Sequence, residues 1–486
     1  MMKKVFYSIV LGLLSFGALA QENNETTVKV WTLKECIDHA LANNLDVQRS
    51  QYNVENSEID YNQSRAALLP SVNASVSNGF NWGRSINPVT NAFTTQEIRS
   101  LSPNASSSVT LFNGLRIQNT IKQTSRSYHA SEEDLQKSKN DVSLNVINLY
   151  INVIFNKELL DNAKFQLSSS QQQLERTKKQ VAAGALPKSD ELNLDAQVAT
   201  NELNVITNEN ALNLSMLQLK QALQLPASTP MDVEVPNITV EDLTLDQSSE
   251  QVFEIARQSM PEIRSAELKV QSSAYAVKAA KGGLYPRLSL GASISSNYSS
   301  ANDEPQPIIA DGFDIVPTTT PIGFVDGSTT PVYGFRSQFR NYSDGYGYSD
   351  QLQDNLFRSV SLTLSIPIFN AFQARASVRR SVVSQHLAEI SSKQVYQTLR
   401  QNVETAYNDA YAASKSYNSS IRQVQAREEA YRMTKQRFDI GAANYVEYQV
   451  AENDLFRAKS DLSRAKYNFI FRKKLLDFYQ GKPLGF

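Results

Sequence analysis

The sequence is poor in the residues that most catalytic and metal sites require. Its 486 residues contain three histidines and a single cysteine, so an internal disulfide is excluded. His39, His129 and His386 stand far apart without metal-ligand spacing, and no glycine-rich phosphate loop or nucleophile elbow is present. Cys36 is expected on a buried helix face. These absences argue against an enzyme, and we predict no catalytic residue, cofactor or metal ligand.

An excess of charge of one sign and long apolar runs are also missing. The 48 basic and 49 acidic residues give a net charge of −1, which leaves no basic face for nucleic acid. Beyond the N-terminus, no segment reaches the roughly 18 uncharged apolar residues of a transmembrane helix. Met1–Ala20 instead combines two lysines, a short apolar run and an Ala-Leu-Ala cleavage site, the pattern of a bacterial signal peptide. The chain is therefore predicted to be exported.

What the sequence does contain is one long stretch that occurs twice. Phe112–Pro226 aligns without a gap with Phe369–Pro483, and a glycine falls at the same place in both copies, at Gly184 and Gly441. Apolar residues recur at every seventh position, as in helices packed along a seam. In the first copy these are Val146, Val153, Leu160, Leu167, Leu174 and Val181. Each copy is predicted to be a long helix, a tight turn at the glycine and a returning helix.

The duplication extends to the segments that precede these helices. Each half begins with a further helix, and in the first half Thr32 and Glu35 form the capping box that opens it. The entering and returning helices together match the long helix in length, at 1.5 Å per residue. The predicted segments are a signal peptide (1–20), a first structural repeat (21–226), a linker at mid-height (227–248) and a second repeat (249–486).

Between its helices, each repeat carries two short segments in which apolar and small polar residues alternate. This alternation predicts strands with one apolar and one serine-rich face. In a soluble sheet the apolar face would meet a helix, whereas in an outer-membrane barrel it would meet lipid. The length of about ten residues and the aromatic strand ends favour the barrel. The predicted strands are 71–82, 104–112, 287–298 and 357–369; the predicted lipid-facing residues are Val76, Leu111, Leu290, Leu362 and Leu364; and the predicted aromatic girdle is Phe80, Trp82 and Tyr298.

Four strands cannot close a barrel, because unpaired backbone groups at the two sheet edges are costly in lipid. Two chains would give eight strands, a barrel about filled by its own side chains, whereas three would give twelve and leave a lumen. The segment 299–356 is much longer than its counterpart in the first half, and it is rich in Pro, Gly, Asp and Tyr. Long loops at one end of the strands indicate an extracellular face. The helices are then predicted to extend the barrel into the periplasm as a conduit.

With this layout, the sequence resembles the TolC family of outer membrane efflux proteins over essentially the whole mature chain. The most specific local likeness is Arg437–Glu447, which is similar to the family's turn of an aromatic, a glycine and an acidic residue. The resemblance implies an α+β membrane protein in which duplicated, antiparallel coiled-coil helices form a periplasmic tunnel and three chains share a 12-stranded outer-membrane barrel. It also implies that a periplasmic adaptor (membrane fusion) protein, coupled to an inner-membrane RND, ABC or similar transporter, docks at the tip residues Gly184, Ala185, Gly441 and Ala442.

Acidic residues near the tunnel entrance are a further feature that the resemblance implies, and Asp190 and Glu447 occupy the matching positions. An alternative interpretation is that these carboxylates stabilise the N-terminus of the helix that follows each turn. The basic and acidic residues that some members carry after the second glycine are replaced here by Ala443 and Val450. How the entrance closes is therefore left open.

Three functions compete at this stage. The favoured one is the exit duct of a tripartite efflux or type I secretion system in the bacterial outer membrane. An exported coiled-coil scaffold or adhesin without a pore would explain the helices, but it leaves the amphipathic strands without a role. An envelope enzyme would need a constellation of residues that the sequence lacks. The cargo is not specified, because selection is expected to belong to the pump.

Overall fold

The computed structural model describes residues 29–86, 93–95, 97–236, 247–303, 305, 309–342 and 344–482. The expected signal peptide and residues 237–246 of the expected linker lie outside these ranges. The chain divides into two compact units. One comprises Met1–Ser57, Ser127–Val270 and Ala388–Phe486, and the other comprises Glu58–Arg126 and Gln271–Leu387.

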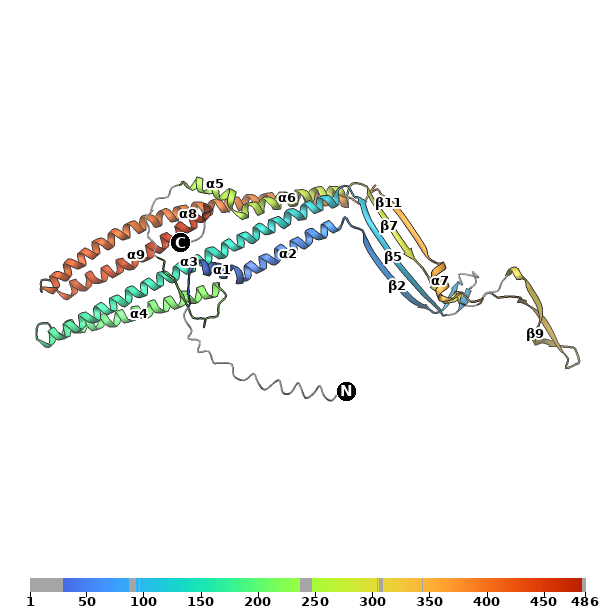
Figure 1. Cartoon of the computed structure of the whole chain (residues 1–486), viewed down its shortest axis with the longest axis horizontal. Helices are drawn as coiled ribbons and strands as arrows, with labels where there is room; N and C mark the ends of the chain where they lie inside the picture. Colours follow the sequence, from blue (N-terminus) through green and yellow to red (C-terminus); the bar gives the residue numbers. More distant parts are fainter. Residues whose placement is uncertain are drawn as a thin grey trace, which may run out of the picture. The chain divides into compact units, whose positions relative to one another are not determined.

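Helix lengths repeat between the two halves of the chain. α1 (Leu33–Asn43) and α5 (Ser249–Ser259) each have 11 residues, and α2 (Leu45–Ala66) and α6 (Pro261–Gly282) each have 22. α3 (Arg116–Ala182) and α8 (Gln373–Asp439) each have 67, and α4 (Lys188–Ala222) and α9 (Tyr445–Tyr479) each have 35. This is the predicted duplication of long helices joined by tight turns (Figure 1).

Each entering helix is interrupted, where the sequence predicts a continuous one. Asn44 adopts an extended conformation, donates its backbone N–H to the Ala40 carbonyl and accepts a bond from the Asp46 amide at 2.8 Å through its side chain. It therefore ends α1 and begins α2. In the second repeat Met260 is extended in the same way, and Pro261 starts the next helix. Proline fits the first turn of a helix but not its interior.

The core of the helical unit forms around the middle of α3, where Tyr150 is fully buried. The Tyr150 hydroxyl lies 3.0 Å from the Trp31 carbonyl oxygen and 2.8 Å from that of Glu234. These carbonyls belong to or follow two short strands, β1 (Lys29–Trp31) and β6 (Met231–Val233), which pair in parallel. The sequence pattern does not predict this pairing. It joins the segment before α1 to the segment after α4.

The predicted heptad seam lies largely inside the helical unit. Val146, Val153, Leu160 and Leu174 are buried in α3, and Cys36 is buried with a free thiol. A further cluster contains residues of both helical hairpins, among them Leu194 of α4 and Tyr448 of α9. The hairpins therefore pack on each other through the seam. Within the described residues, no helix is long and apolar enough to cross a membrane.

The second unit contains an antiparallel sheet in the order β11-β7-β5-β2, with β8 (Tyr298–Ser299) also paired to β5 (Figure 1). The long strands are β2 (Ser71–Asn81), β5 (Ile98–Phe112), β7 (Arg287–Ser295) and β11 (Phe357–Ser365). Each repeat contributes one strand pair, and the β5–β7 contact joins the pairs. β2 and β11 are left at the two edges.

Strand ends differ from the sequence prediction at several points. β5 begins at Ile98 rather than at 104, although Pro103 lies inside it. Pro103 stands opposite Val76, and its carbonyl accepts a bond from the Ser296 amide. A proline lacks only the N–H, so a position that uses its carbonyl is tolerated. β11 ends at Ser365, before Pro367, instead of reaching 369.

The segment 299–356, predicted only as a long loop, contains secondary structure of its own. β9 (Phe313–Phe324) and β10 (Pro331–Phe339) form a hairpin, and α7 (Tyr348–Asp354) precedes β11. Two 3₁₀ turns, at Ser300–Asn302 and Ile309–Asp311, complete its described elements. In the first repeat, β3 (Arg84–Ile86) and β4 (Phe93–Thr95) form a shorter hairpin at the corresponding place.

Candidate functional site

The turns between the long helices have the same geometry in both repeats. Gly184 and Gly441 adopt φ of 76° and 75°, a left-handed conformation that glycine takes without steric cost. The residue after each glycine donates its amide back to the helix, Ala185 to Gln180 at 2.9 Å and Ala442 to Arg437 at 2.7 Å. These bonds satisfy carbonyls at the helix ends. A Cβ at either glycine would meet no atom within 4 Å, so conformation alone requires glycine there.

The second tip is held by more side-chain contacts than the first. The Asn444 side chain accepts a bond from the Glu447 amide at 2.9 Å and donates to its carboxylate at 3.1 Å, which caps α9. Arg437 donates to the Ala442 carbonyl at 3.2 Å and lies 3.6 Å from Glu447. Glu447 thus has a local structural role in capping. In the first repeat Pro187 stands at the cap position and makes no side-chain bond.

Asp190 lies in the first turn of α4, close to the second hairpin. Burial, with smaller contributions from Glu452 and Asp190, raises the pKa of the Tyr445 hydroxyl on α9. Asp190 and the second tip are therefore electrostatic neighbours within the helical unit. Ala443 and Val450 carry no charge, and neither forms a hydrogen bond through its side chain.

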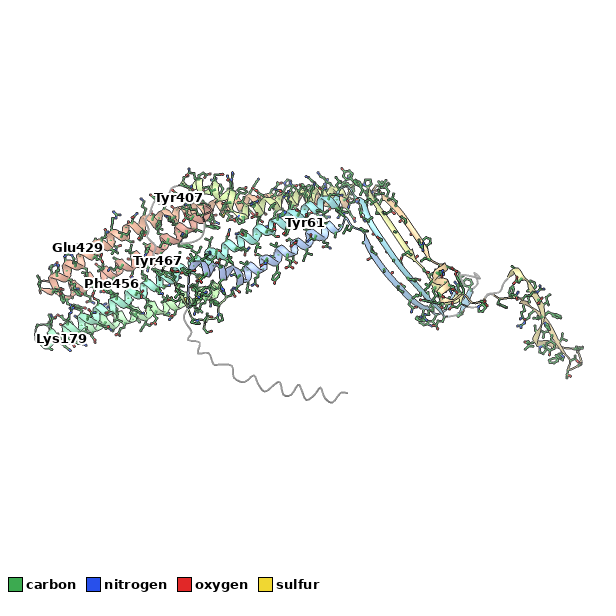
Figure 2. The ribbon with its side chains drawn as sticks, in the orientation of Figure 1. Tyr61, Lys179, Tyr407, Glu429, Phe456 and Tyr467 are labelled. Atoms are coloured by element: carbon green, nitrogen blue, oxygen red, sulfur yellow. The ribbon has the colours of Figure 1, made fainter. Side chains whose placement is uncertain are left out.

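A buried polar cluster, missed by the sequence analysis, lies between α3, α8 and α9. Glu452 is only 7% exposed, and its carboxylate accepts bonds from Ser169 of α3 at 2.8 Å and from Tyr448 at 3.1 Å. Tyr448 and Tyr431 of α8 lie 3.1 Å apart at their hydroxyls. A neighbouring pocket of about 760 Å³ includes Phe456, labelled on α9 in Figure 2. The signal in the sequence was a glutamate three residues before the seam residue Leu455.

The sheet has one apolar and one polar face, as the alternation predicts. Cross-strand register pairs Leu290 with Leu362 on one face and Ser289 with Thr363 on the other. The residues predicted to face lipid are exposed in the single chain, from 36% for Leu290 to 69% for Val76. Leu111, Leu362 and Leu364 fall within this range. Exposed apolar residues gathered on one face are typical of an interaction surface.

One residue of the predicted aromatic girdle, Tyr298, is buried in the single chain, whereas the other two are exposed. Phe80 and Trp82 are exposed and stacked, with ring centroids 6.1 Å apart, and Trp82 follows the end of β2. Tyr298 is only 9% exposed, because it packs edge-on against Tyr348 of α7 and donates its hydroxyl to Asp303. The predicted strand 287–298 ends at Tyr298, whereas β7 ends at Ser295, and the sequence pattern does not show that α7 covers this tyrosine.

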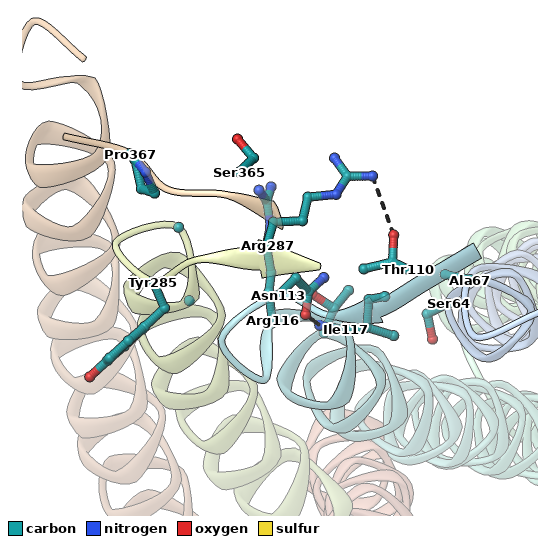
Figure 3. Close-up of a pocket in the computed structure, with 13 residues that line it drawn as sticks. Ser64, Ala67, Thr110, Asn113, Arg116, Ile117, Tyr285, Arg287, Ser365 and Pro367 are labelled. Atoms are coloured by element: carbon teal, nitrogen blue, oxygen red, sulfur yellow. Dashed lines mark hydrogen bonds between the residues drawn. The ribbon is translucent and has the colours of Figure 1, made fainter. Parts of the chain in front are cut away.

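A pocket of about 490 Å³ opens where the strands meet the helices of the second unit (Figure 3). Arg116 at the start of α3 and Arg287 at the start of β7 line it together with hydroxyl side chains. Arg287 donates to the Thr110 hydroxyl at 3.2 Å, as the dashed line in Figure 3 marks. The sequence pattern predicts no role for either arginine. Among the described residues, no three His, Cys, Asp or Glu side chains gather where they could hold a metal ion.

Comparison with known proteins assigns the family. A family model described as outer membrane efflux protein matches residues 36–224 and 252–473, which is most of the chain. The chain belongs to this family. The family predicted from the sequence is thereby confirmed, and the protein is an efflux protein of the outer membrane.

The relatives of this protein are distant in sequence, but the matches cover most of their length. Outer membrane protein TolC of Escherichia coli (strain K12) is 20% identical over 479 residues, which cover 97% of this chain and 85% of the relative. The solvent efflux pump outer membrane protein SrpC of Pseudomonas putida is 23% identical over 452 residues, covering 88% and 81%.

Solved structures show that the fold is shared. Crystal structures of CusC match with a TM-score of 0.73 at 18% identity, covering 96% of each chain. The outer membrane protein VceC from Vibrio cholerae matches with a TM-score of 0.71 at 13% identity, covering 93% of this chain and 96% of that one. The α+β fold class predicted for the outer membrane efflux protein is confirmed by these matches.

Proposed function

We propose that this protein is the exit duct of a tripartite efflux or type I secretion system, and that three copies share one 12-stranded barrel. The observation that carries the proposal is the sheet itself. It has only four long strands, its edges β2 and β11 lack a partner strand within the described residues, and one face is apolar and exposed. Open edges do not occur in lipid. Three copies would pair every edge and leave a lumen lined by the serine-rich face.

The tip turns at Gly184–Ala185 and Gly441–Ala442 are proposed to dock a periplasmic adaptor, which links the duct to an inner-membrane RND, ABC or similar pump. The duct is proposed to conduct cargo passively and to catalyse no reaction, since the pump supplies the energy. Neither nucleic acid nor a cofactor has a part in it. The runner-up function, a coiled-coil scaffold without a pore, gives the apolar sheet face no role.

The assembly is tested by joining edge strands of neighbouring copies. In a Cys36→Ser background, single cysteines would be scanned along β2 and along β11 of the same chain, and the protein would be oxidised in the outer membrane. A shared barrel predicts a covalent species of three chains for pairs in register. Cysteines on the central strand β5 combined with β11 provide the control, because β7 lies between them. A largest species of two chains, or no cross-link in any register, would contradict the trimer.

The membrane face is tested by a matched pair of charge substitutions on β11. Leu362→Arg places a charge on the apolar face and is expected to cost about 2–4 kcal/mol if that face meets the bilayer midplane. Thr363→Arg places the same charge on the polar face and is expected to assemble normally. The measurement is the amount of trimer extracted from purified outer membranes. Equal assembly of both variants would refute the assignment of lipid-facing residues and favour the scaffold.

A further inference from the structure

The pocket at the strand–helix junction carries two positive side chains and no negative one. Its lining includes Arg116, Arg287, Ser64, Thr110 and Ser365, and no aspartate or glutamate. Within the part of the chain that the structure describes, neither arginine forms an ion pair, and the Arg287 guanidinium donates to the Thr110 hydroxyl alone, at 3.2 Å. Guanidinium groups that face a common space without a carboxylate are suited to bind an anion.

The backbone around the pocket is built by a close approach of two chain segments. Gly114 has φ of 66°, and a Cβ there would lie 2.6 Å from the Gly282 carbonyl oxygen. A Cβ at Gly282 would in turn lie 2.8 Å from the Arg116 Cβ. The turn before α3 can contact the end of α6 in this way only because both residues at the contact, Gly114 and Gly282, lack a Cβ. The contact fixes Arg116 at one side of the pocket, while the strand β7 fixes Arg287.

The position of the arginine on β7 decides which face of the sheet the pocket belongs to. Arg287 stands opposite Ser365, and Leu288 stands opposite Leu364. Because side chains alternate along a strand, Arg287 and Ser365 share the polar face, and the leucines share the apolar face. If the apolar face meets lipid, as proposed above, the pocket opens toward the lumen rather than toward acyl chains.

We propose that Arg116 and Arg287 form a binding site for an anionic oxygen group, phosphate or carboxylate, at the junction of barrel and helices. The cavity of about 490 Å³ accommodates a phosphate with part of the molecule that bears it. Hydroxyls of Thr110 and Ser365 supply neutral donors beside the two charges. The inference rests on the proposed function for its direction, since three copies would place six arginines around one lumen. The anion comes either from a solute in transit or from the headgroup of a lipid.

The test uses inorganic phosphate as the probe and the full-length protein purified in mild detergent. Isothermal titration is expected to show one phosphate bound per chain, and Arg287→Gln or Arg116→Gln is expected to weaken binding about tenfold or more. Arg287→Lys, which keeps the charge, is expected to recover part of the affinity. Arg380→Gln is the matched control, because it removes the same charge from α8 outside the pocket lining. Circular dichroism and the mass of the assembly check that the variants remain folded.

Three outcomes are informative. Phosphate binding that falls in the pocket variants and not in the control supports the site, and binding without prior delipidation identifies a solute as the source. Binding that appears only after delipidation, together with an anionic phospholipid released from the wild type, also supports the site and identifies the lipid headgroup. Absence of binding after delipidation, or an equal loss in Arg380→Gln, overturns it. Because titration requires no open pore, a failure of the duct proposal in conductance measurements would be seen separately.

Discussion

Replacing Glu452 with glutamine is expected to stabilise the helical unit at neutral pH. The carboxylate is 7% exposed, and burial raises its pKa above its ordinary value of 4.5, while the hydroxyls of Ser169 and Tyr448 offset only part of that cost. A glutamine at this position keeps the volume and the acceptor oxygen that both hydroxyls use. It removes the buried charge, which is the unfavourable component.

The magnitude follows from two opposing effects. Each hydrogen bond to the carboxylate weakens when its acceptor becomes neutral, by about 1 kcal/mol, so the pair at 2.8 and 3.1 Å loses about 2 kcal/mol. Removing a buried charge recovers several kcal/mol of desolvation. Since the raised pKa shows that desolvation dominates, the net gain for Glu452→Gln is on the order of 1–2 kcal/mol.

The dependence on pH has a definite sign. The native carboxyl binds its proton more tightly than the unfolded one, so the free energy of unfolding decreases as pH rises from 4.5 through the raised pKa of Glu452. Below pH 4.5 the wild-type side chain is neutral in both states, and the variant loses its advantage. Glu452→Gln is thus expected to flatten the fall in stability across this window and to match the wild type at its acidic end.

The measurement is thermal unfolding in detergent, followed by circular dichroism at several pH values. Asp454→Asn serves as the control on the same helix, because Asp454 is a more exposed residue paired with Arg427 at 2.8 Å. Such a pair contributes about 0–1 kcal/mol, so this variant should be neutral or slightly less stable. A Glu452→Gln protein that melts below the wild type at neutral pH would refute the reasoning, since the charge would then be stabilising.

Two further predictions concern glycines and the core. Gly114→Ala is expected to lower the melting temperature more than Gly441→Ala. Both substitutions force alanine into a left-handed conformation, which costs about 1–2 kcal/mol, but only the new Cβ at position 114 also collides with the Gly282 carbonyl. Equal melting temperatures of the two variants would contradict the close approach. Tyr150→Phe is expected to cost about 1–2 kcal/mol by leaving the Glu234 carbonyl without its hydroxyl donor, a loss measurable by the same unfolding assay; an unchanged melting temperature would show that the hydroxyl contributes nothing.

The sequence predicted the helices well, because each carries its own evidence. Heptad spacing, a turn glycine and a capping box are local signals. Because the chain is duplicated, the helices of one repeat can be checked against those of the other. The sequence also predicted which face of each strand is apolar, because the alternation around Leu290 and Leu362 indicates it without knowledge of the pairing. The break at Asn44 was missed because apolar periodicity continues almost unchanged across it, although an asparagine is a common cap.

What the sequence could not predict depends on contacts between distant segments. The burial of Tyr298 depends on α7, which lies about fifty residues further along the chain. The pocket depends on register between β5, β7 and β11, which brings Arg287 beside Thr110. The pattern in a single sequence indicates which face of a helix or strand is apolar, but not which distant segment packs against it. The first part of β5 was not predicted because Pro103 argues against a strand in the sequence. Only the pairing with neighbouring strands shows that the missing N–H of this proline is not needed.

The equal helix lengths in the two repeats have a consequence for how such a chain can change. Inserting one residue into α3 or α8 would rotate every later side chain by about 100° around the helix axis. A seam that repeats every seven residues over 67 residues would then face away from its neighbours on one side of the insertion. The chain can therefore vary in length only in segments that do not belong to a heptad seam. In this chain the halves differ most in length at 299–356, which is where natural variation in length, and engineered insertions, should be accommodated.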